Sequence, residues 1–370
     1  MNKDVGKVKA GKVGQAEDKK SLPIFAKYGL IALAIVVVIA IALVIWFNVA
    51  GSYAATIGSE KIGTGEFKYY LEVEKQNMYK SALNVDPNLT SETFWSTPMS
   101  GENAIDVAKK KVIDNLKLVK IQLIKAKESK ISLTSAELKS IDDGIKTNII
   151  DSMGSGNKIQ ANTALQKQYG FTIDDLRNAQ IENYTVQKYQ SSEIGKVTVA
   201  DADIKKDYDA DPKSFDKVTV RHILFLFVGS DGKRSKEDSK KLADDTLAKI
   251  KAGDDMTALS EKLSEDPGVT SNKGEYAVTK FDSYVPAFKD WALKANVGDM
   301  AVVESTDSKG YHVMKAEKRE SQTFDTVKGN IKSQLIQDKF GKQYTDQLDS
   351  WKKDTKYNVK LNNPVYNSIT

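Results

Sequence analysis

The most apolar part of the chain is a run of eighteen residues, 30–47, that contains no polar side chain. With Tyr28 and Gly29 in front of it, the run approaches twenty residues. A helix rises about 1.5 Å per residue, so a helix of this length matches a hydrocarbon core of about 30 Å. The pattern therefore predicts a transmembrane anchor over residues 28–50.

The residues in front of the apolar run predict its orientation. Residues 1–27 contain seven lysines against three acidic residues, which accounts for +4 of the chain's net charge of +5. By the positive-inside rule, this basic tail is cytoplasmic and the bulk of the chain is extracytoplasmic, held by a single pass through the cell membrane. The alternative is a cleaved signal peptide, because small residues follow at 50–56. Signal segments run for about 7–15 apolar residues, so the longer run favours an uncleaved anchor.

Beyond the anchor, apolar residues three or four apart predict long amphipathic helices over residues 109–130, 174–191 and 323–353. Each apolar stripe needs a partner surface, so the helical stretches early and late in the chain are expected to pack together. The stripes consist of Val112, Leu116, Val119, Leu123 and Ala126 in the first, Leu176, Ala179, Ile181, Tyr184 and Tyr189 in the second, and Val327, Ile331, Leu335, Ile336, Phe340, Tyr344, Leu348 and Trp351 in the third.

The periodicity changes in the region between these helices. Alternation of apolar and polar residues over 217–228 and 310–317 predicts two strands. Two amphipathic helices are predicted between them, over 236–252 and 254–264. Their inward residues are expected to be Leu242, Ala243, Leu247 and Ile250 in the first, and Met256, Leu259 and Leu263 in the second. A mixed α/β unit is therefore inserted between two helical stretches.

The two predicted strands carry the only two histidines of the chain. On the first strand, His222 shares a face with Val220 and Leu224; on the second, His312 shares a face with Met314. Each pattern alone is typical of a histidine buried in a core. What surrounds the two residues decides between a core role and a functional one.

Composition excludes several classes of function. The absence of cysteine excludes disulfides, thiolate catalysis, cysteine-ligated zinc and an N-terminal lipid anchor. Two histidines argue against a histidine-rich metal site, and we expect neither a metal nor a cofactor. Only four arginines and a nearly neutral body argue against nucleic-acid binding. The chain also lacks the H-E-x-x-H, G-x-S-x-G and P-loop patterns of metalloproteases, hydrolases and nucleotide-binding enzymes.

Six motifs follow one another within residues 218–319. They are RHIL (221–224), KAGDDMTALSEKLSED (251–266), KGE (273–275), VPAF (285–288), VGDM (297–300) and GYHVMK (310–315). In this order and spacing the segment resembles the parvulin-type peptidyl-prolyl cis-trans isomerases, and both histidines fall on the paired histidines of that family. More loosely, residues 55–71 and 324–351 resemble the helical domain that brackets the parvulin domain in membrane-anchored foldases of the PrsA, SurA and PpiD type.

The resemblance implies an α+β fold. A parvulin domain, consisting of a small antiparallel sheet with surrounding helices, would be inserted in an all-helical chaperone domain that follows one transmembrane helix. The expected organisation is a cytoplasmic basic tail (1–27), an anchor (28–50), the first part of the chaperone domain (54–214), the isomerase domain (215–319), the second part of the chaperone domain (320–362) and a tail (363–370).

The resemblance also implies the site. The expected catalytic residues are His222, Asp266 and His312. The expected substrate-binding residues are Tyr276, Tyr284, Phe288 and Asp307. The histidines would form a hydrogen-bonded pair at the floor, and Phe288 would pack on the proline ring. Tyr276, Tyr284 and Asp307 stand where the family has leucine, methionine and threonine, and a carboxylate near Asp266 would raise the pKa of both acids. Reduced activity is therefore one expected outcome.

The implied function is an extracytoplasmic foldase that isomerises X-Pro bonds and chaperones exported proteins. Its expected partners are unfolded or partly folded exported polypeptides with X-Pro bonds, together with the membrane through residues 28–50. The alternative is a catalytically weak or inactive holdase that only binds unfolded chains, and a purely structural anchored protein is a third reading. A homodimer stays open at this point.

Overall fold

The computed structural model describes residues 53–228, 232, 234–305 and 309–370. The anchor predicted over residues 28–50, the basic tail in front of it and Asp307 lie outside the described residues. Within the described ranges, no helix is both long enough and apolar enough to cross a membrane.

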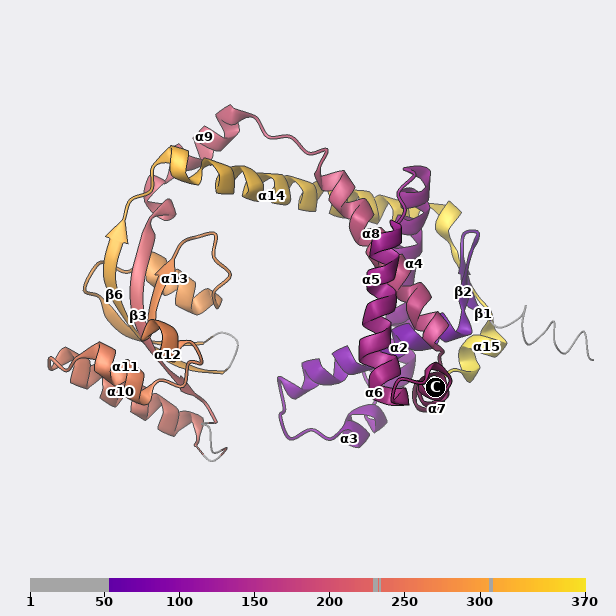
Figure 1. Cartoon of the computed structure of the whole chain (residues 1–370), viewed down its shortest axis with the longest axis horizontal. Helices are drawn as coiled ribbons and strands as arrows, with labels where there is room; N and C mark the ends of the chain where they lie inside the picture. Colours follow the sequence, from indigo (N-terminus) through magenta and orange to yellow (C-terminus); the bar gives the residue numbers. More distant parts are fainter. Residues whose placement is uncertain (1–52, 229–231, 233, 306–308) are drawn as a thin grey trace, which may run out of the picture. The chain divides into compact units, whose positions relative to one another are not determined.

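The described chain divides into two compact units (Figure 1). One comprises the described residues of Met1–Val186 together with Trp351–Thr370, and the other is Gln187–Ser350. The boundaries fall within two long helices, α8 (Ile173–Ile194) and α14 (Phe324–Lys353). The late helical stretch that was predicted to pack with the early ones lies mostly in the second unit, where Val327 and Ile331 pack with Ile204 and Phe215. Trp351 at its end packs against the core of the first unit.

The first unit contains a small antiparallel sheet as well as helices. Its strands are β1 (Tyr53–Ile57), β2 (Glu60–Gly63) and β7 (Val359–Leu361), in the order β2-β1-β7. The expectation of an all-helical domain is therefore wrong. The strands escaped the pattern because they are three to five residues long, and β7 pairs with β1 from the far end of the chain, which no local period reveals.

Helices make up most of this unit. They are α2 (Thr64–Leu83), α3 (Ser91–Ser96), α4 (Ala104–Glu128), α5 (Ser135–Ile145), the π-helical turn η1 (Lys146–Ile150), α6 (Asp151–Gly154), α7 (Lys158–Tyr169), the first part of α8, the short turn η3 (Thr355–Tyr357) and α15 (Asn363–Ser368). Phe67 and Leu71 of α2 pack against Val112 and Leu116 of α4 in the core. The stripe predicted for α8 is wrong at Tyr184, which is 51% exposed.

The second unit is built on a four-stranded antiparallel sheet of order β4-β3-β6-β5. Its strands are β3 (Lys217–Leu226), β4 (Glu275–Val278), β5 (Met300–Glu304) and β6 (Gly310–Glu320). Its helices are the last part of α8, α9 (Asp201–Ala210), η2 (Pro212–Phe215), α10 (Lys236–Lys251), α11 (Met256–Leu263), α12 (Val269–Asn272), α13 (Pro286–Lys294) and most of α14. The two predicted strands and the two helices between them agree with this structure, with ends that differ by up to three residues.

The alternation along β3 places two hydrophobic clusters on opposite faces of the sheet. Val218 and Val220 pack with Phe288 of α13. Ile223 and Phe225 pack under α10 and α11, on the other face (Figure 1). Leu242 of α10 was expected to face inward, but it is 41% exposed because the buried stripe of that helix runs through Ala243, Thr246 and Ile250 instead.

Candidate active site

The two histidines meet on the face of the sheet that α13 covers. In the register of β3 with β6, His222 pairs with Met314 and Leu224 pairs with His312, so the histidines lie diagonally on neighbouring strands. Both side chains are buried, and their Nδ1 atoms are 3.2 Å apart, within hydrogen-bond distance. One Nδ1 must carry a proton and donate it in the hydrogen bond, and the other Nδ1 must be unprotonated and act as the acceptor. The tautomer of one ring therefore determines the tautomer of the other.

Asp266 determines which tautomers are compatible with this hydrogen bond. Its Oδ2 lies 2.9 Å from His222 Nε2, and its Oδ1 accepts the Gly268 N–H at 3.0 Å. The hydrogen bond from His222 holds the pKa of the Asp266 carboxyl well below its usual range, so the group is an ionised acceptor. A neutral His222 then donates from Nε2 and accepts at Nδ1, which leaves His312 as the donor within the pair.

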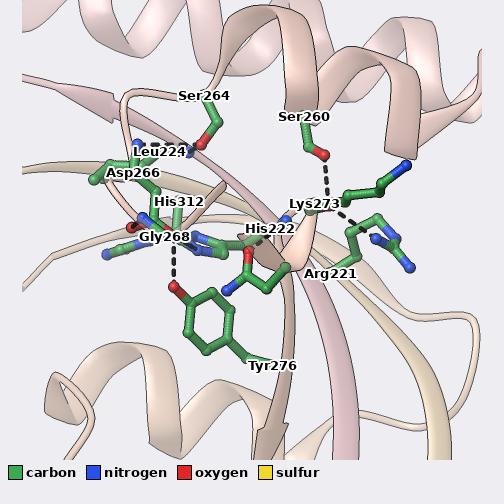
Figure 2. A network of polar contacts seen from close by, with 12 residues as sticks. Arg221, His222, Leu224, Ser260, Ser264, Asp266, Gly268, Lys273, Tyr276 and His312 are labelled. Carbon is green, nitrogen blue, oxygen red and sulfur yellow. Dashed lines mark hydrogen bonds and ion pairs between the residues drawn. The ribbon is translucent and has the colours of Figure 1, made fainter. Parts of the chain in front are cut away.

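Asp266 lies in the loop after α11, and hydrogen bonds between this loop and β3 hold it at the histidines (Figure 2). The Leu224 N–H donates to Ser264 Oγ at 3.1 Å, and the Glu265 N–H donates to the Leu224 carbonyl at 2.9 Å. The carboxylate of Glu265 accepts the Leu226 N–H at 2.7 Å and pairs with Arg234. One strand thus positions both His222 and the loop that carries its acid.

The far end of the same loop is held from the opposite face of β3. Arg221 donates to the Lys273 carbonyl at 2.8 Å, and Ser260 Oγ donates to the same oxygen at 2.6 Å (Figure 2). The next residue, Gly274, has a φ of +78°, and a Cβ there would lie 2.4 Å from the His222 carbonyl. Only glycine fits this close approach of loop and strand.

A cavity of about 240 Å³ opens above the histidines. It is lined by His222, Leu224, Asp266, Tyr276, Tyr284, Val285, Phe288 and His312. The Phe288 ring makes edge contacts with both imidazoles, with centroids 5.1 and 5.3 Å apart. Among the lining residues that the structure describes, Asp266 is the one carboxylate, and aliphatic and aromatic groups form most of the rest. The cavity can hold a small apolar ring next to a fixed hydrogen-bond network.

Residues 205–320 match the family model of the PPIC-type PPIASE domain. The chain carries a parvulin-type peptidyl-prolyl cis-trans isomerase domain. The enzyme class that the six sequence motifs implied is thereby confirmed.

Over most of its length, the chain is also similar to curated proteins. It is 26% identical over 309 residues to the foldase protein PrsA of Caldanaerobacter subterraneus subsp. tengcongensis, which covers 83% of this chain and 87% of that protein. It is 27% identical over 265 residues to the foldase protein PrsA of Clostridium botulinum, covering 69% and 74%. Among solved structures, the peptidylprolyl isomerase PrsA of Bacillus cereus aligns with 73% of this chain and 95% of its own, at 24% identity and a TM-score of 0.33.

In the parvulin domain, the structure brings six of the seven expected site residues to one cavity. Asp307, the seventh, lies outside the described residues. Sequence reasoning did not name Leu224 as a residue of the site, although it follows His222 by two positions on the same face of the strand and lines the cavity. The alternation of the strand is the signal that could have found it. Sequence reasoning also missed Gly268 and Ser264, whose contacts with Asp266 depend on loop geometry that no sequence period encodes.

Proposed function

We propose that this chain is a membrane-anchored, extracytoplasmic foldase that catalyses cis-trans isomerisation of X-Pro bonds and chaperones exported proteins. The observation that carries the proposal is the apolar cavity above the pair formed by His222 and His312, with Asp266 hydrogen-bonded to one of them. The similarity to proteins named foldase protein PrsA over 83% of this chain supports the chaperone part. Anchoring rests on the apolar residues 28–50.

The cavity suits a reaction that breaks no covalent bond. Rotation about an amide faces a barrier of about 18–20 kcal/mol, because the twisted bond loses its resonance. The twisted amide is less polar than the planar one, so an apolar surrounding favours it over the ground state. Phe288 packs on the pyrrolidine ring in this scheme, and Tyr276 and Tyr284 form the walls.

The two histidines orient the site and do not act as general bases. Both Nδ1 atoms are engaged with one another, and Nε2 of His222 donates to Asp266. This chain of hydrogen bonds fixes the floor of the cavity, so the catalyst does not have to reorganise its polar groups as the amide twists. Asp266 is the charged group at one end of this row of hydrogen bonds.

A protease-coupled peptide assay on the full chain in detergent tests the catalytic claim. We expect acceleration of cis-to-trans exchange in an Ala-Pro peptide, and a loss of most of it in His222→Ala. If the wild-type chain leaves the cis-to-trans rate at its uncatalysed value, and His222→Ala does not change that rate, the catalytic part of the proposal is wrong.

The alternative is a holdase whose parvulin domain binds chains without isomerising them. The observation that favours it is that two bulky rings, Tyr276 and Tyr284, line the cavity in edge contact with each other, with centroids 5.7 Å apart, at positions where the family has leucine and methionine. Suppression of aggregation of an unfolded client separates the two functions. Suppression that survives both His222→Ala and Asp266→Asn, in a protein without isomerase activity, supports the holdase.

A further inference from the structure

Tyr276 makes a polar contact that its place in the wall of an apolar cavity does not require. Its hydroxyl donates to Asp266 Oδ2 at 2.7 Å, the same oxygen that lies 2.9 Å from His222 Nε2 (Figure 2). The tyrosine comes from β4, whereas Asp266 comes from the loop after α11. The hydroxyl therefore ties a separate strand to the acid of the site.

The neighbouring glycine leaves room for this contact. A Cβ on Gly268 would lie 2.5 Å from the Tyr276 hydroxyl oxygen. The φ of Gly268 is −77°, a value that any residue can adopt, so the backbone conformation does not require glycine. The space next to the hydroxyl is the feature that demands it.

Asp266 consequently receives donors from three parts of the chain. His222 and Tyr276 contact Oδ2, and the Gly268 N–H contacts Oδ1. The side chain of Asp266 is 14% exposed, so water contributes little to its solvation. Hydrogen bonds to an ionised, poorly hydrated carboxylate are stronger than those between neutral groups and fix its orientation.

We propose that Tyr276 is a positioning residue for the isomerase reaction, whose hydroxyl holds Asp266 in the orientation that accepts the proton of His222 Nε2 and so fixes the tautomers of both histidines. The inference rests on the proposed isomerase function and adds to it a role for a hydroxyl at this position. The ring of Tyr276 lines the cavity separately, through its apolar face.

The two parts of Tyr276 can be separated by substitution. Tyr276→Phe keeps the ring and removes the donor, so binding of the proline ring is retained. We expect kcat to fall roughly tenfold, which corresponds to the loss of one hydrogen bond to a charged group, with KM changed less than about twofold. A role confined to packing would change neither constant.

A double-mutant cycle shows whether the hydroxyl acts through Asp266. Tyr276→Phe is combined with Asp266→Asn in the full chain in detergent, and kcat is measured for all four proteins. We expect Tyr276→Phe to have little further effect once Asp266 has been replaced. An equal loss in both backgrounds would overturn the proposal.

Gly268→Ala is a second way to remove the hydrogen bond between the Tyr276 hydroxyl and Asp266. The added Cβ displaces the tyrosine hydroxyl, so this variant should lose activity like Tyr276→Phe. Added to Tyr276→Phe, where no hydroxyl remains to collide with, it should cost little more. Tyr208→Phe is the matched control, because its hydroxyl donates to the Gln322 carbonyl, away from the cavity, and its loss should leave kcat and KM unchanged.

A readout independent of activity distinguishes failure of this inference from failure of the proposed function. Burial and the hydrogen bond to Asp266 raise the pKa of the Tyr276 phenol. In protein labelled at tyrosine Cζ, the carbon resonance of Tyr276 should titrate at lower pH in Asp266→Asn than in wild type, whether or not the chain is an active isomerase. An unchanged titration would contradict the contact itself.

Discussion

His222 and His312, ninety residues apart in the sequence, approach each other within 3.2 Å through their Nδ1 atoms. The antiparallel register of β3 and β6 sets this distance, because it pairs Leu224 with His312 and leaves His222 one diagonal step away. Neither ring can change its tautomer without a matching change in the other or the loss of their hydrogen bond.

This coupling predicts the effect of removing the second histidine. In His312→Ala, His222 keeps its bond to Asp266 but loses the donor at Nδ1, which leaves an unsatisfied buried acceptor. We expect kcat for an Ala-Pro peptide to fall about tenfold or more, while circular dichroism shows an unchanged fold. Activity at the wild-type level would separate His312 from the reaction.

Asp266 is the one carboxylate among the described residues of the cavity lining, and its charge predicts a substrate preference. A charge on the residue before proline, about 8 Å from the Asp266 carboxylate in a mostly aqueous environment, interacts with it by about 0.5 kcal/mol. Replacing Glu by Lys reverses the sign of this interaction, so kcat/KM should change by about fivefold in favour of Lys. The measurement is a comparison of Lys-Pro and Glu-Pro peptides at low salt and pH 8. The preference should shrink in 0.5 M salt and disappear in Asp266→Asn.

Gly274 offers a test of how the acid loop is held to β3. In Gly274→Ala, an unfavourable positive φ is combined with a Cβ 2.4 Å from the His222 carbonyl, so we expect a loss of about 2–3 kcal/mol of stability and a reduced kcat. Gly298→Ala is the matched control: its φ is +92°, but nothing lies within 4 Å of the added Cβ. It should cost about 1 kcal/mol and leave kcat unchanged. Equal losses of stability, measured by thermal unfolding, would contradict the close approach.

The first unit contains a buried charge cluster that predicts a dependence on pH. Lys120 Nζ of α4 lies 2.7 Å from a carboxylate oxygen of Glu66 in α2 and 2.6 Å from one of Glu182 in α8. The Tyr70 hydroxyl, which donates to Asn183 Oδ1 at 3.0 Å, interacts electrostatically with both carboxylates. Burial, with a contribution from the second carboxylate, raises the pKa of Glu66 to about 7.

The sign of the effect follows from that raised pKa. The folded state holds the Glu66 proton more tightly than the unfolded state, so the stabilisation is complete below a pH of about 4.5 and is lost as the pH rises through about 7. We expect α2 and α4 to exchange amide hydrogens faster at pH 8 than at pH 6, after correction for intrinsic rates, by an amount that corresponds to about 1 kcal/mol.

Glu66→Gln mimics the protonated form and should remove most of this pH dependence. Asp143→Asn, which breaks the exposed pair between Lys139 and Asp143, is the control and should leave it unchanged. A pH dependence that is the same in Glu66→Gln would show that another group titrates.

The sequence predicted the site to the extent that strand alternation and recognisable motifs encode it. Alternation placed His222 with Leu224 and His312 with Met314, and the register between the strands then brought the two faces together. Asp266 and Phe288 were identified only through the family resemblance, because neither has a periodic signature. The hydroxyl contact of Tyr276 with Asp266 depends on the path of a loop that left-handed residues at 273 and 274 shape, and a pattern of polar and apolar residues does not contain that path.

The errors of the sequence prediction have equally local causes. Leu242 and Tyr184 were assigned inward because their spacing fits a helical stripe, but helices α10 and α8 each bury a narrower stripe that excludes them. The sheet of the first unit was missed because β7 contributes only three residues and meets β1 from the other end of the chain.

The most direct test of the proposed function is the exchange rate of one X-Pro bond, measured by NMR exchange spectroscopy on an Ala-Pro peptide with the full chain in detergent. Wild-type protein should produce cis-trans exchange cross-peaks at a millisecond-to-second mixing time, and His222→Ala at equal concentration should not. Exchange that remains as slow as in the free peptide, or that His222→Ala leaves unchanged, would contradict the assignment of the paired histidines to prolyl isomerisation.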